Sequence, residues 1–487
     1  MSNNNTSAPR DAQWRDELRK KMPAKERTAI PRVKMPELDP QYRVTCNDEV
    51  NQGLNAQQAV IEASRCMDCP DPHCVTGCPV NINIPGFIKN IERGDFHAAA
   101  VVLKETSALP AVCGRVCPQE KQCESRCLYH KMKKEPVAIG YLERFAADTE
   151  RLSGNTALPK METPNGIKVA VVGSGPAGLS FAGDMAKRGF DVTVFEALHE
   201  IGGVLKYGIP EFRLPNAVVE VEINGLRDMG VKFEKDCIVG KTLSYDDMHE
   251  MGFKGIFVAS GAGLPRFMGI PGENLNGVMS SNEYLTRVNL MGAGRADWDT
   301  PVLRGKRVAV IGGGNTAMDS VRTARRMGAE VAMVVYRRSE DEMPARVEEV
   351  KHAKEEGVQF MTLHNPIEYR GDEKGRVNTM LVQEMELGEP DASGRRSPIA
   401  IEGAIKEIPV DLVIVSVGVS PNPLIPNAIP ELEVSRRGTI VVNEESMKSS
   451  LNDIYAGGDI VRGGATVILA MGDGRRAAAA MADALSK

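Results

Sequence analysis

Short runs of consecutive apolar residues, separated by glycine-rich turns, set the pattern of the chain after residue 167. The runs at residues 168–172 and 191–195 are rich in valine, which is typical of strands buried in a parallel sheet. Between them, small and apolar residues follow a helical spacing over residues 176–188, up to Gly189. This order predicts a strand–helix–strand unit of an α/β domain.

A glycine-rich turn joins the first strand of this unit to its helix. The turn residues expected to bind a dinucleotide are Gly173, Gly175, Pro176, Ala177 and Gly178. The first glycine suits a tight turn, the second lets the backbone approach a pyrophosphate, and the third lets the helix pack closely on the strand. The amino end of the helix adds N–H donors and the positive end of its dipole. Glu196 ends the second strand, where a carboxylate accepts hydrogen bonds from ribose hydroxyls.

The same unit recurs at residues 307–338, with a second glycine turn. The residues expected to bind its dinucleotide are Gly312, Gly314, Asn315, Thr316 and Ala317. Its second strand ends in Arg337 and Arg338 rather than in an acid. A carboxylate at this place repels a 2′-phosphate, whereas arginines bind it. The first unit is therefore expected to hold FAD or NAD, and the second to hold NADP.

Strand and turn signals return near the C-terminus, at residues 454–459. Asp459 follows Gly458 in this turn, where its carboxylate is placed to bind a ribityl or ribose hydroxyl. A small-residue helix that begins near Thr466 would direct its amino end at a flavin ring. An earlier apolar run at residues 256–259, followed by Gly261, marks where the chain leaves the first dinucleotide domain.

These signals predict an α/β protein with two Rossmann-like domains, the second inserted in the first, after a helical amino-terminal domain. The expected segments are a polar arm at residues 1–40, the helical domain at 41–150, the first dinucleotide domain at 166–298, the second at 299–437, and a C-terminal part of the first at 438–487. The arm is interpreted as a flexible or surface-hugging extension with one short helix near residues 11–21. The charged run at residues 348–356 is interpreted as an exposed helix face, and residues 391–396 as a polar turn.

Composition and charge indicate the cellular location and the classes of partner to expect. A formal net charge of −5 argues against non-specific nucleic-acid binding and offers no polybasic membrane anchor. Residues 1–30 lack the apolar segment of a signal peptide, and the longer uncharged runs contain glycine or proline. We therefore expect a reducing, cytoplasmic location with no nucleic-acid or membrane partner. In that setting, clustered cysteines are metal ligands or redox groups rather than disulfides.

Eight of the ten cysteines lie in two groups between residues 66 and 127. They are Cys66, Cys69, Cys74 and Cys78, then Cys113, Cys117, Cys123 and Cys127. Zinc sites also use closely spaced cysteine pairs, but the Cys-x3-Cys-Pro endings resemble iron–sulfur runs. Iron–sulfur clusters would also give a flavin domain its electron outlet, so they are favoured over zinc and disulfides. The isolated Cys237 is interpreted as a buried structural thiol.

Six motifs together resemble the flavoprotein oxidoreductases with two dinucleotide-binding domains. They are GSGPAG with Glu196, the GG-x-L-x-YGIP run with Gly203 and Leu205, VASGA at 258–262, GGGNTAMD at 312–319, YRR at 336–338 and AGGD at 456–459. With the cysteine groups, the chain resembles the small (β) subunits of NADPH-dependent glutamate synthases from about residue 35 to the end. The same module resembles the amino-terminal part of dihydropyrimidine dehydrogenase. It also resembles the FAD-bearing large subunit of NADH-dependent ferredoxin:NADP oxidoreductase.

The resemblance implies FAD in the first dinucleotide domain, NADP(H) in the second and two [4Fe–4S] clusters in the helical domain. It adds Gly203 and Leu205 to the expected FAD-binding residues, which also include Gly261, Gly458 and Thr466. One cluster would be held by Cys66, Cys69, Cys74 and Cys127, and the other by Cys78, Cys117, Cys123 and an eighth ligand. The eighth ligand is Cys113 by cysteine count, or Glu143 by its place in some relatives. Both alternatives stay open.

The resemblance further implies an electron-input subunit. NADPH would reduce FAD, and electrons would pass through the clusters to a large (α) subunit that carries FMN and makes glutamate from glutamine and 2-oxoglutarate. No side chain is expected to act as acid, base or nucleophile, because the cofactors carry hydride transfer. One alternative is the FAD-bearing subunit of an electron-bifurcating NADH-dependent ferredoxin:NADP oxidoreductase, with another electron-accepting partner. The other is a non-catalytic zinc-binding scaffold that senses redox state.

Overall fold

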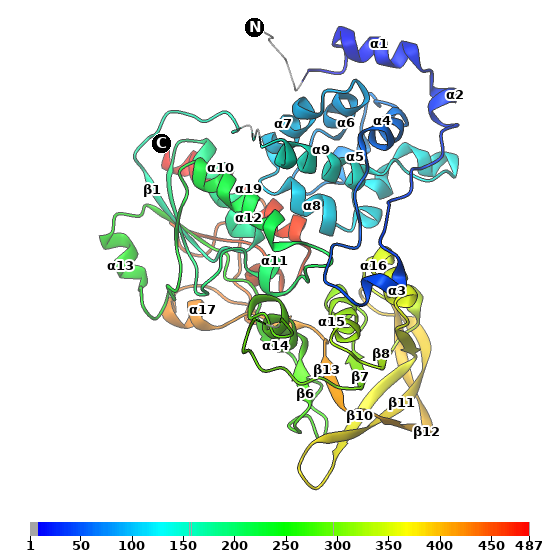
Figure 1. Cartoon of the computed structure of the whole chain (residues 1–487). Helices are drawn as coiled ribbons and strands as arrows, with labels where there is room; N and C mark the ends of the chain where they lie inside the picture. The colour runs from blue at the N-terminus through cyan, green and yellow to red at the C-terminus, as the bar shows by residue number, and fades with distance from the viewer. Residues whose placement is uncertain (1–7, 155, 157, 296, 487) are drawn as a thin grey trace.

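The computed structural model describes residues 8–154, 156, 158–295 and 297–486, so the first seven residues of the expected arm lie outside it. After the arm come a helical domain and two five-stranded parallel sheets with helices packed against them (Figure 1). The predicted fold class is confirmed, with helices first and two α/β domains after them.

The helical domain consists of helices joined by turns that carry the cysteines. Its longer helices are α4 (Ala56–Ser64), α6 (Ile84–Glu92), α7 (Phe96–Thr106), α8 (Pro110–Val116) and α9 (Ile139–Ser153), and its short ones are α5 (His73–Thr76), η1 (Gln119–Lys121), η2 (Glu124–Arg126) and η3 (Leu128–Met132). Asn55 caps α4 in a capping box with Gln58. Asp95 caps α7 by accepting a hydrogen bond from the N–H of Ala98. These caps mark where the two helices begin.

The first parallel sheet has the strand order β15-β4-β1-β2-β3. Its strands are β1 (Lys168–Val172), β2 (Asp191–Phe195), β3 (Lys232–Glu234), β4 (Gly255–Val258) and β15 (Ile454–Ala456). Because β15 comes from the C-terminal segment and pairs with β4, the chain returns to this sheet after building the second one. The predicted insertion of one domain in the other is therefore confirmed. Helices α10 (Pro176–Lys187) and α19 (Val467–Leu485) pack against each other and against this sheet (Figure 1).

The second parallel sheet has the strand order β6-β13-β7-β8-β9. Its strands are β6 (Val278–Ser280), β7 (Arg307–Ile311), β8 (Val331–Tyr336), β9 (Gln359–Thr362) and β13 (Leu412–Val415). Helix α15 (Asn315–Arg326) follows β7, and α16 (Val347–Glu355) follows β8. The chain enters this sheet at β6, earlier than residue 299, where the sequence placed the boundary. Strand β6 is only three residues long, so it leaves no apolar run for the sequence pattern to detect.

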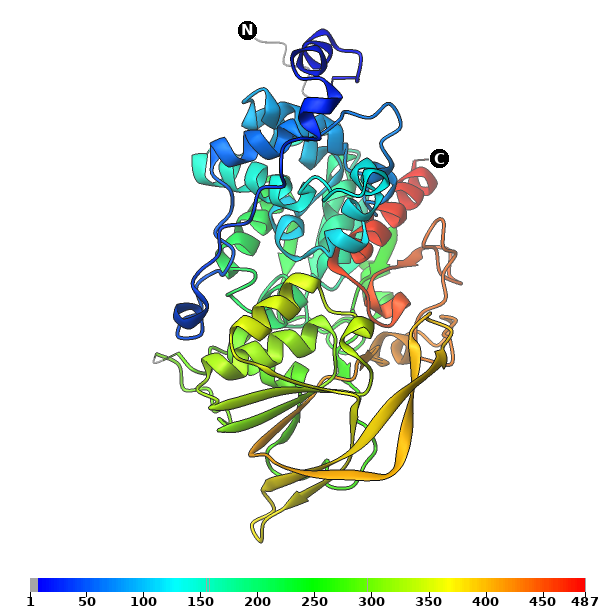
Figure 2. The same ribbon diagram turned by 90° about the vertical axis from the view of Figure 1, so that its right-hand side faces the viewer.

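A three-stranded antiparallel sheet extends from the second domain (Figure 1 and Figure 2). Its strands are β10 (His364–Gly371), β11 (Val377–Pro390) and β12 (Arg396–Pro409). Tyr369, Met380 and Val382 pack it against the parallel sheet at Ile311 and Val335. The polar turn predicted at residues 391–396 is confirmed, and it joins β11 to β12. Because β11 runs between two turns, the β10–β11 turn lies at the opposite end of this sheet.

The described part of the arm lies along the protein surface (Figure 2). It contains helices α1 (Gln13–Lys21), α2 (Ala24–Arg27) and α3 (Pro40–Arg43), so in the structure the arm continues past residue 40 to Arg43. Arg27 is buried and donates to the carbonyl oxygen of Ser64 at 2.6 Å. Arg43 is buried against α16 and pairs with Glu355 and Glu356, each at 2.9 Å. The arm therefore hugs the surface and connects the helical domain to the second dinucleotide domain.

Two local interpretations need correction. The charged run at residues 348–356 is an exposed helix face only in part: Lys351, Lys354 and Glu355 are exposed, but Glu349, His352 and Glu356 are buried. Arginines from distant segments surround these carboxylates, and a local charge pattern carries no sign of them. Cys237 lies after the end of β3 and is half buried rather than buried. Among the helices of the described chain, none is long and apolar enough to cross a membrane.

Candidate functional site: two dinucleotide turns and a cysteine-rich domain

Four thiols meet beside the short helix α5, and they belong to Cys66, Cys69, Cys74 and Cys127. Burial raises the pKa of the Cys74 thiol, and the other three thiols raise it further by charge repulsion. Cys69, Cys74 and Cys127 are half buried, so this group lies close to the protein surface. These are the four ligands expected for one cluster.

The second group consists of Cys78, Cys113, Cys117 and Cys123, all of them buried. Burial raises the pKa of Cys78 to about 12, with the Glu143 carboxylate and the Cys117 thiol as further causes. A hydrogen bond with Cys117 and burial raise the pKa of Cys113, and burial raises that of Cys123. Glu143 adds to both of these shifts. One carboxylate is therefore close enough to act on three of the four thiols.

Glu143 lies on α9 and is buried. Its Oε1 atom accepts no hydrogen bond from any described residue. Burial raises its pKa to about 8, and the Glu222 carboxylate adds to this effect. A buried carboxylate oxygen without a partner is costly unless it binds a cation or a metal. The clustered thiols, none of them in a disulfide, and this oxygen fit the donor set of [4Fe–4S] clusters.

The first glycine turn has the geometry that a dinucleotide phosphate needs. Gly173 has a φ of +101°, and an added Cβ would lie 2.5 Å from the carbonyl oxygen of Ala259. Gly175 is the N-cap of α10, and no atom lies within 4 Å of the place its Cβ would take. The first turn of the helix is made of Pro176, Ala177 and Gly178. The amino end of α10 therefore faces open space, as an anion site requires.

Glu196 follows β2, as predicted, and its oxygens already hold the glycine turn. Oε2 accepts from the N–H of Ser174 at 2.9 Å and from its hydroxyl at 2.5 Å. Oε1 accepts from the N–H of Leu198 at 2.9 Å. A carboxylate oxygen can accept a second hydrogen bond, so the position still suits a ribose hydroxyl.

The loop before α11 (Val204–Tyr207) closes on the glycine turn. The N–H of Gly202 donates to the Ser174 hydroxyl at 2.9 Å. A Cβ on Gly203 would lie 3.0 Å from the Cα of Gly175, so the two loops are in close contact. Leu205 is fully buried behind them. The structure therefore brings Gly203 and Leu205 to the first dinucleotide turn, as the resemblance implied.

The remaining expected FAD residues follow β4 and β15. Gly261 has no atom within 4 Å of its Cβ position, and Gly458 precedes α18 (Asp459–Arg462) next to Ala177. Asp459 is half buried, and burial raises its pKa. Thr466 caps α19. These residues lie near the carboxyl ends of adjacent strands, which is where open parallel sheets bind ligands.

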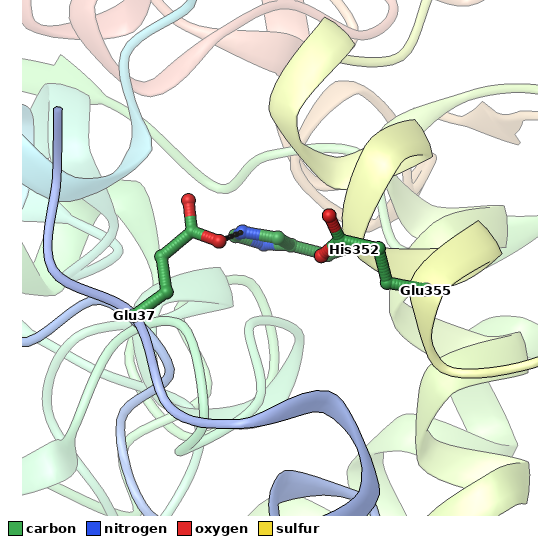
Figure 3. A group of neighbouring side chains, drawn as sticks. All are labelled: Glu37, His352 and Glu355. Carbon is green, nitrogen blue, oxygen red and sulfur yellow. Dashed lines mark ion pairs between the residues drawn. The ribbon is translucent and has the colours of Figure 1, made fainter.

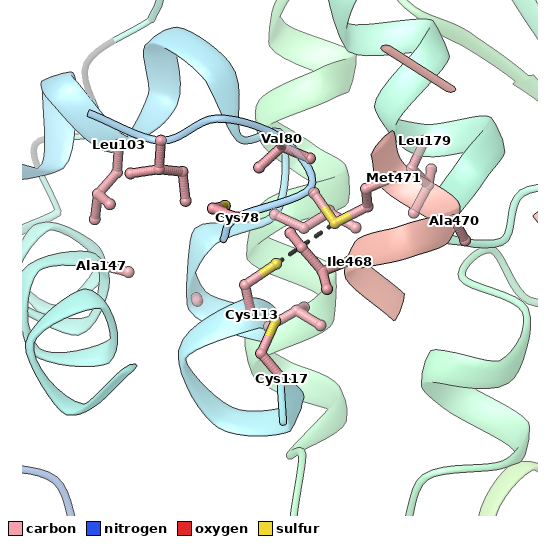
Figure 4. Packing of buried hydrophobic residues seen from close by; sticks show 14 of the residues in the cluster. Cys78, Val80, Leu103, Cys113, Cys117, Ala147, Leu179, Ile468, Ala470 and Met471 are labelled. Carbon is pink, nitrogen blue, oxygen red and sulfur yellow. Dashed lines mark hydrogen bonds between the residues drawn. The ribbon is translucent and has the colours of Figure 1, made fainter. Parts of the chain in front are cut away.

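Helix α19 joins the first dinucleotide site to the buried cysteines (Figure 4). The Sδ atom of Met471 lies 3.4 Å from the Sγ atom of Cys113. A Cβ added to Gly472 would lie 2.9 Å from the carbonyl oxygen of Pro79 in the cysteine loop. On its other side, the Met471 carbonyl accepts from the Ser180 hydroxyl of α10 at 3.0 Å. One helix thus touches both the phosphate-turn helix and the cluster loop, and no motif in the sequence marks this contact.

The second glycine turn repeats the first in the other sheet. Gly312 has a φ of +136°, and an added Cβ would overlap the Ser416 carbonyl. Gly314 is the N-cap of α15, and the nearest atom to its Cβ position is 4.0 Å away. Asn315 accepts from the N–H of Arg346 at 2.9 Å through its side-chain oxygen. The next two residues are the exposed Thr316 and the buried Ala317.

The two arginines after β8 are in different environments. Arg337 is exposed and makes no ion pair within the described residues. Arg338 is buried, pairs with Asp391 at 2.5 Å and donates to the carbonyl oxygen of Arg396 at 2.8 Å. Asp391 and Arg396 thus lie beside Arg338, and no sequence signal marked them because the β11–β12 turn that carries them is remote from β8 in the sequence.

A buried ion network connects the two dinucleotide domains. Arg213, from the loop after α11, pairs with Asp319 of α15 at 2.7 Å and with Glu349 of α16 at 3.1 Å. Arg322 pairs with Glu349, and with Glu356 at 2.7 Å. The network continues through Glu356 into the arm, so three parts of the molecule are held in one arrangement.

Glu37, His352 and Glu355 meet at the edge of this network (Figure 3). The Nε2 atom of His352 lies 3.4 Å from a Glu37 oxygen. These residue types can bind a metal ion, but Lys351 pairs with Glu37 at 3.1 Å and Arg43 pairs with Glu355 at 2.9 Å. Because side chains already neutralise both carboxylates, we interpret the group as an ion-pair contact between the arm and α16.

Two family models match the chain. The model described as "Dihydroprymidine dehydrogenase domain II, 4Fe-4S cluster" matches residues 43–155, and that described as "Pyridine nucleotide-disulphide oxidoreductase" matches residues 167–482. Fold, site and models together define an NAD(P)-dependent flavoprotein oxidoreductase with an amino-terminal [4Fe–4S] domain, in which FAD and NADP(H) are the nucleotides.

The relatives narrow this class. The glutamate synthase [NADPH] small chain of Azospirillum brasilense is 37% identical over 88% of this chain and 90% of its own. That of Escherichia coli K12 is 36% identical over 88% and 92%. The chain belongs to the family of glutamate synthase [NADPH] small chains. Mycobacterium tuberculosis FprA in complex with NADPH is a structural relative that shares the fold, with a TM-score of 0.55 and 20% identity over 66% of this chain and 85% of its own.

Proposed function

We propose that the protein is the electron-input subunit of a glutamate synthase. It oxidises NADPH at FAD and passes electrons through two [4Fe–4S] clusters to a large subunit. That subunit, which carries FMN, makes glutamate from glutamine and 2-oxoglutarate. A cytoplasmic location fits the free thiols of the cysteine groups.

The observation that carries the proposal is the contact of α19 with the buried cysteine group. Met471 and Gly472 lie against Cys113 and Pro79, on the helix whose cap residue is Thr466 of the FAD site. The other cysteine group is half buried and nearer the surface. This arrangement supports a route from FAD to the buried group, then to the exposed group, and out to a partner.

The protein residues position the cofactors rather than react. When bound, FAD accepts hydride from NADPH, and the iron–sulfur clusters carry single electrons. The Gly173 and Gly312 turns present backbone N–H groups to two pyrophosphates. The network around Arg213 fixes the two nucleotide domains relative to each other, which hydride transfer over about 3–3.5 Å requires. No acid or base is needed.

We propose Glu143 rather than Cys113 as the eighth cluster ligand. Its Oε1 atom lacks a hydrogen-bond partner among the described residues, and its carboxylate raises the pKa of three of the buried thiols. The Cys113 thiol instead has Met471 at 3.4 Å as a neighbour. An oxygen ligand is harder than a thiolate, so the potential of this cluster should differ from that of an all-cysteine cluster.

The preference for NADPH rests on the arginines after β8. Arg337 offers an exposed guanidinium and Arg338 a buried one, at the strand end where a 2′-phosphate is read. No acid follows β8 directly, in contrast to Glu196 after β2.

The function is tested by assaying the purified chain alone and with its partner. Alone, with NADPH, glutamine and 2-oxoglutarate, it should form no glutamate while still reducing an artificial acceptor such as ferricyanide. Affinity capture of the native protein should retrieve a much larger polypeptide that restores glutamate formation. Unaided glutamate formation, or capture of a small flavin and [2Fe–2S] protein instead, would contradict the proposal. Capture of the small protein would favour the electron-bifurcating alternative.

A further inference from the structure

Charged side chains from two separate segments lie at the end of β8. Arg337 and Arg338 come from the strand end, and Arg396 comes from the β11–β12 hairpin. Asp391 pairs with Arg338 at 2.5 Å, and Glu342 pairs with Arg396 at 2.7 Å. Two guanidinium groups, those of Arg338 and Arg396, are therefore paired with carboxylates where the second domain is expected to receive the nucleotide 2′-phosphate, and Arg337 is unpaired among the described residues.

This arginine group lies next to the second glycine turn. The ring of Tyr336, the last residue of β8, would lie 2.8 Å from a Cβ on Gly313. The Tyr336 hydroxyl donates to the carbonyl oxygen of Glu342 at 2.9 Å. The arginines thus follow a residue that contacts the turn expected to bind the pyrophosphate, at the strand end where a Rossmann domain contacts the ribose.

The pair between Asp391 and Arg338 is not needed to form the hairpin turn. The Oδ1 atom of Asp391 accepts from the N–H of Ser393 at 2.8 Å, and its N–H donates to the carbonyl of Arg395 at 2.7 Å. These bonds close the turn by themselves. The Oδ2 atom is left to pair with Arg338, which is buried and needs an anion beside it.

We propose that Asp391 competes with the 2′-phosphate of NADP(H) for Arg338, so that the β11–β12 turn acts as a gate that weakens NADP(H) binding and leaves NAD(H) binding unchanged. The phosphate displaces the carboxylate because it brings more charge and three acceptor oxygens. The 2′-hydroxyl of NADH is neutral and leaves the pair intact. Residues 392–394 are exposed, so the turn can move without disturbing the core. Arg338 keeps its bond to the Arg396 carbonyl, which holds its guanidinium in place during the exchange.

The inference rests on the proposed NADPH specificity, and titration calorimetry of the full-length holoprotein tests both. The probes are 2′,5′-ADP, which carries the 2′-phosphate, and 5′-AMP, which lacks it. Asp391→Asn keeps the Oδ1 acceptor of the turn and removes the charge. It should lower the Kd for 2′,5′-ADP about five- to tenfold and leave that for 5′-AMP unchanged. Asp391→Glu, which keeps the carboxylate, should not tighten binding.

Asp372→Asn is the matched control. Asp372 accepts from the N–H groups of Lys374 and Arg376 in the β10–β11 turn, at the other end of the same sheet. It should change neither Kd. A 2′,5′-ADP affinity that is unchanged or weaker in Asp391→Asn would overturn the gate and leave the NADP assignment standing. Equal binding of the two probes to the unmodified protein would overturn both.

Discussion

Substitution of Arg337 gives the clearest test of the proposed NADP recognition. Its guanidinium is exposed and unpaired within the described chain, so its removal leaves no buried carboxylate alone. A charge-assisted hydrogen bond contributes about 1.5–3 kcal/mol. Arg337→Ala should therefore raise the KM for NADPH about tenfold or more and leave NADH use little changed.

Steady-state kinetics with both nucleotides make this comparison. Arg337→Lys keeps the charge but not the planar guanidinium, so its KM for NADPH should lie between that of the unmodified protein and that of Arg337→Ala. An equal loss with NADPH and NADH would show that Arg337 does not contact the 2′-phosphate. Arg338→Ala is a poorer test, because it also leaves Asp391 without its partner.

Glu143 and Cys113 are the two candidates for the eighth cluster ligand, and each assignment predicts a different effect of substitution on the iron content. If Glu143 is the eighth ligand, Cys113→Ser should keep about eight iron atoms per chain, the content of two [4Fe–4S] clusters. Glu143→Ala should lose about half of them, and Glu143→Cys should restore them with a shifted electron paramagnetic resonance signal. Metal analysis and that spectrum measure both effects. Iron loss in Cys113→Ser with full iron in Glu143→Ala would assign the ligand to Cys113.

Helix α19 is the element that we propose couples the flavin domain to the clusters. In Gly472→Ala, the new methyl group would approach the Pro79 carbonyl oxygen to 2.9 Å and push the helix away from the cysteine loop. Bleaching of the flavin band by NADPH should keep its rate, whereas cluster reduction should slow several-fold. Anaerobic stopped-flow absorption separates the two phases.

Gly225→Ala on α12 (Asn216–Asp228) is the matched control, because no atom lies within 4 Å of its Cβ position. It should leave both phases unchanged and stabilise the helix by about 0.5–1 kcal/mol. If Gly472→Ala also leaves both phases unchanged, α19 is a packing helix and not part of the electron route.

Helix α16 and the residue after it depend on buried ion pairs. Burial alone would raise the pKa of Glu356, but Arg322 and Arg326 lower it to about 2, from 4.5 for the free side chain. The stabilisation is therefore complete above about pH 4.5 and is lost as the pH falls towards 2. Glu356→Gln should reduce unfolding stability by about 3–5 kcal/mol at neutral pH, because it leaves buried arginines unpaired.

Urea denaturation followed by circular dichroism measures this change at pH 7 and at pH 4. The difference between Glu356→Gln and the unmodified protein should shrink at the lower pH. Glu355→Gln is the neighbouring control, since its side chain is 34% exposed and its pair with Arg43 should contribute no more than about 1 kcal/mol. Equal effects of the two substitutions would show that the network does not stabilise the fold.

In the molecule as a whole, local sequence signals predict the individual helices and strands, whereas contacts between residues distant in the sequence join these helices and strands together. The glycine turns at Gly173 and Gly312 are local features, so the strands and helices around them appear where expected. The C-terminal turn at Gly458 predicted the return to the first sheet because its motif is also local.

The contacts between domains were not predictable in this way. The pair between Arg213 and Asp319 joins residues 106 positions apart, and the contact between Cys113 and Met471 joins residues 358 apart. Neither has a spacing or motif that marks it. The burial of Glu349 and the approach of Asp391 to Arg338 depend on the same kind of long-range partner. The sequence therefore predicted the binding turns but not what surrounds and connects them.

We propose that electrons enter from NADPH at FAD and leave through the cysteine-rich domain. This route is tested by anaerobic titration of the purified holoprotein with NADPH, followed by visible absorption and low-temperature electron paramagnetic resonance. The flavin band should bleach, and a reduced iron–sulfur signal should grow with it. A flavin that bleaches while the clusters stay oxidised, or a protein that contains zinc and no iron, would show that electrons do not take this route.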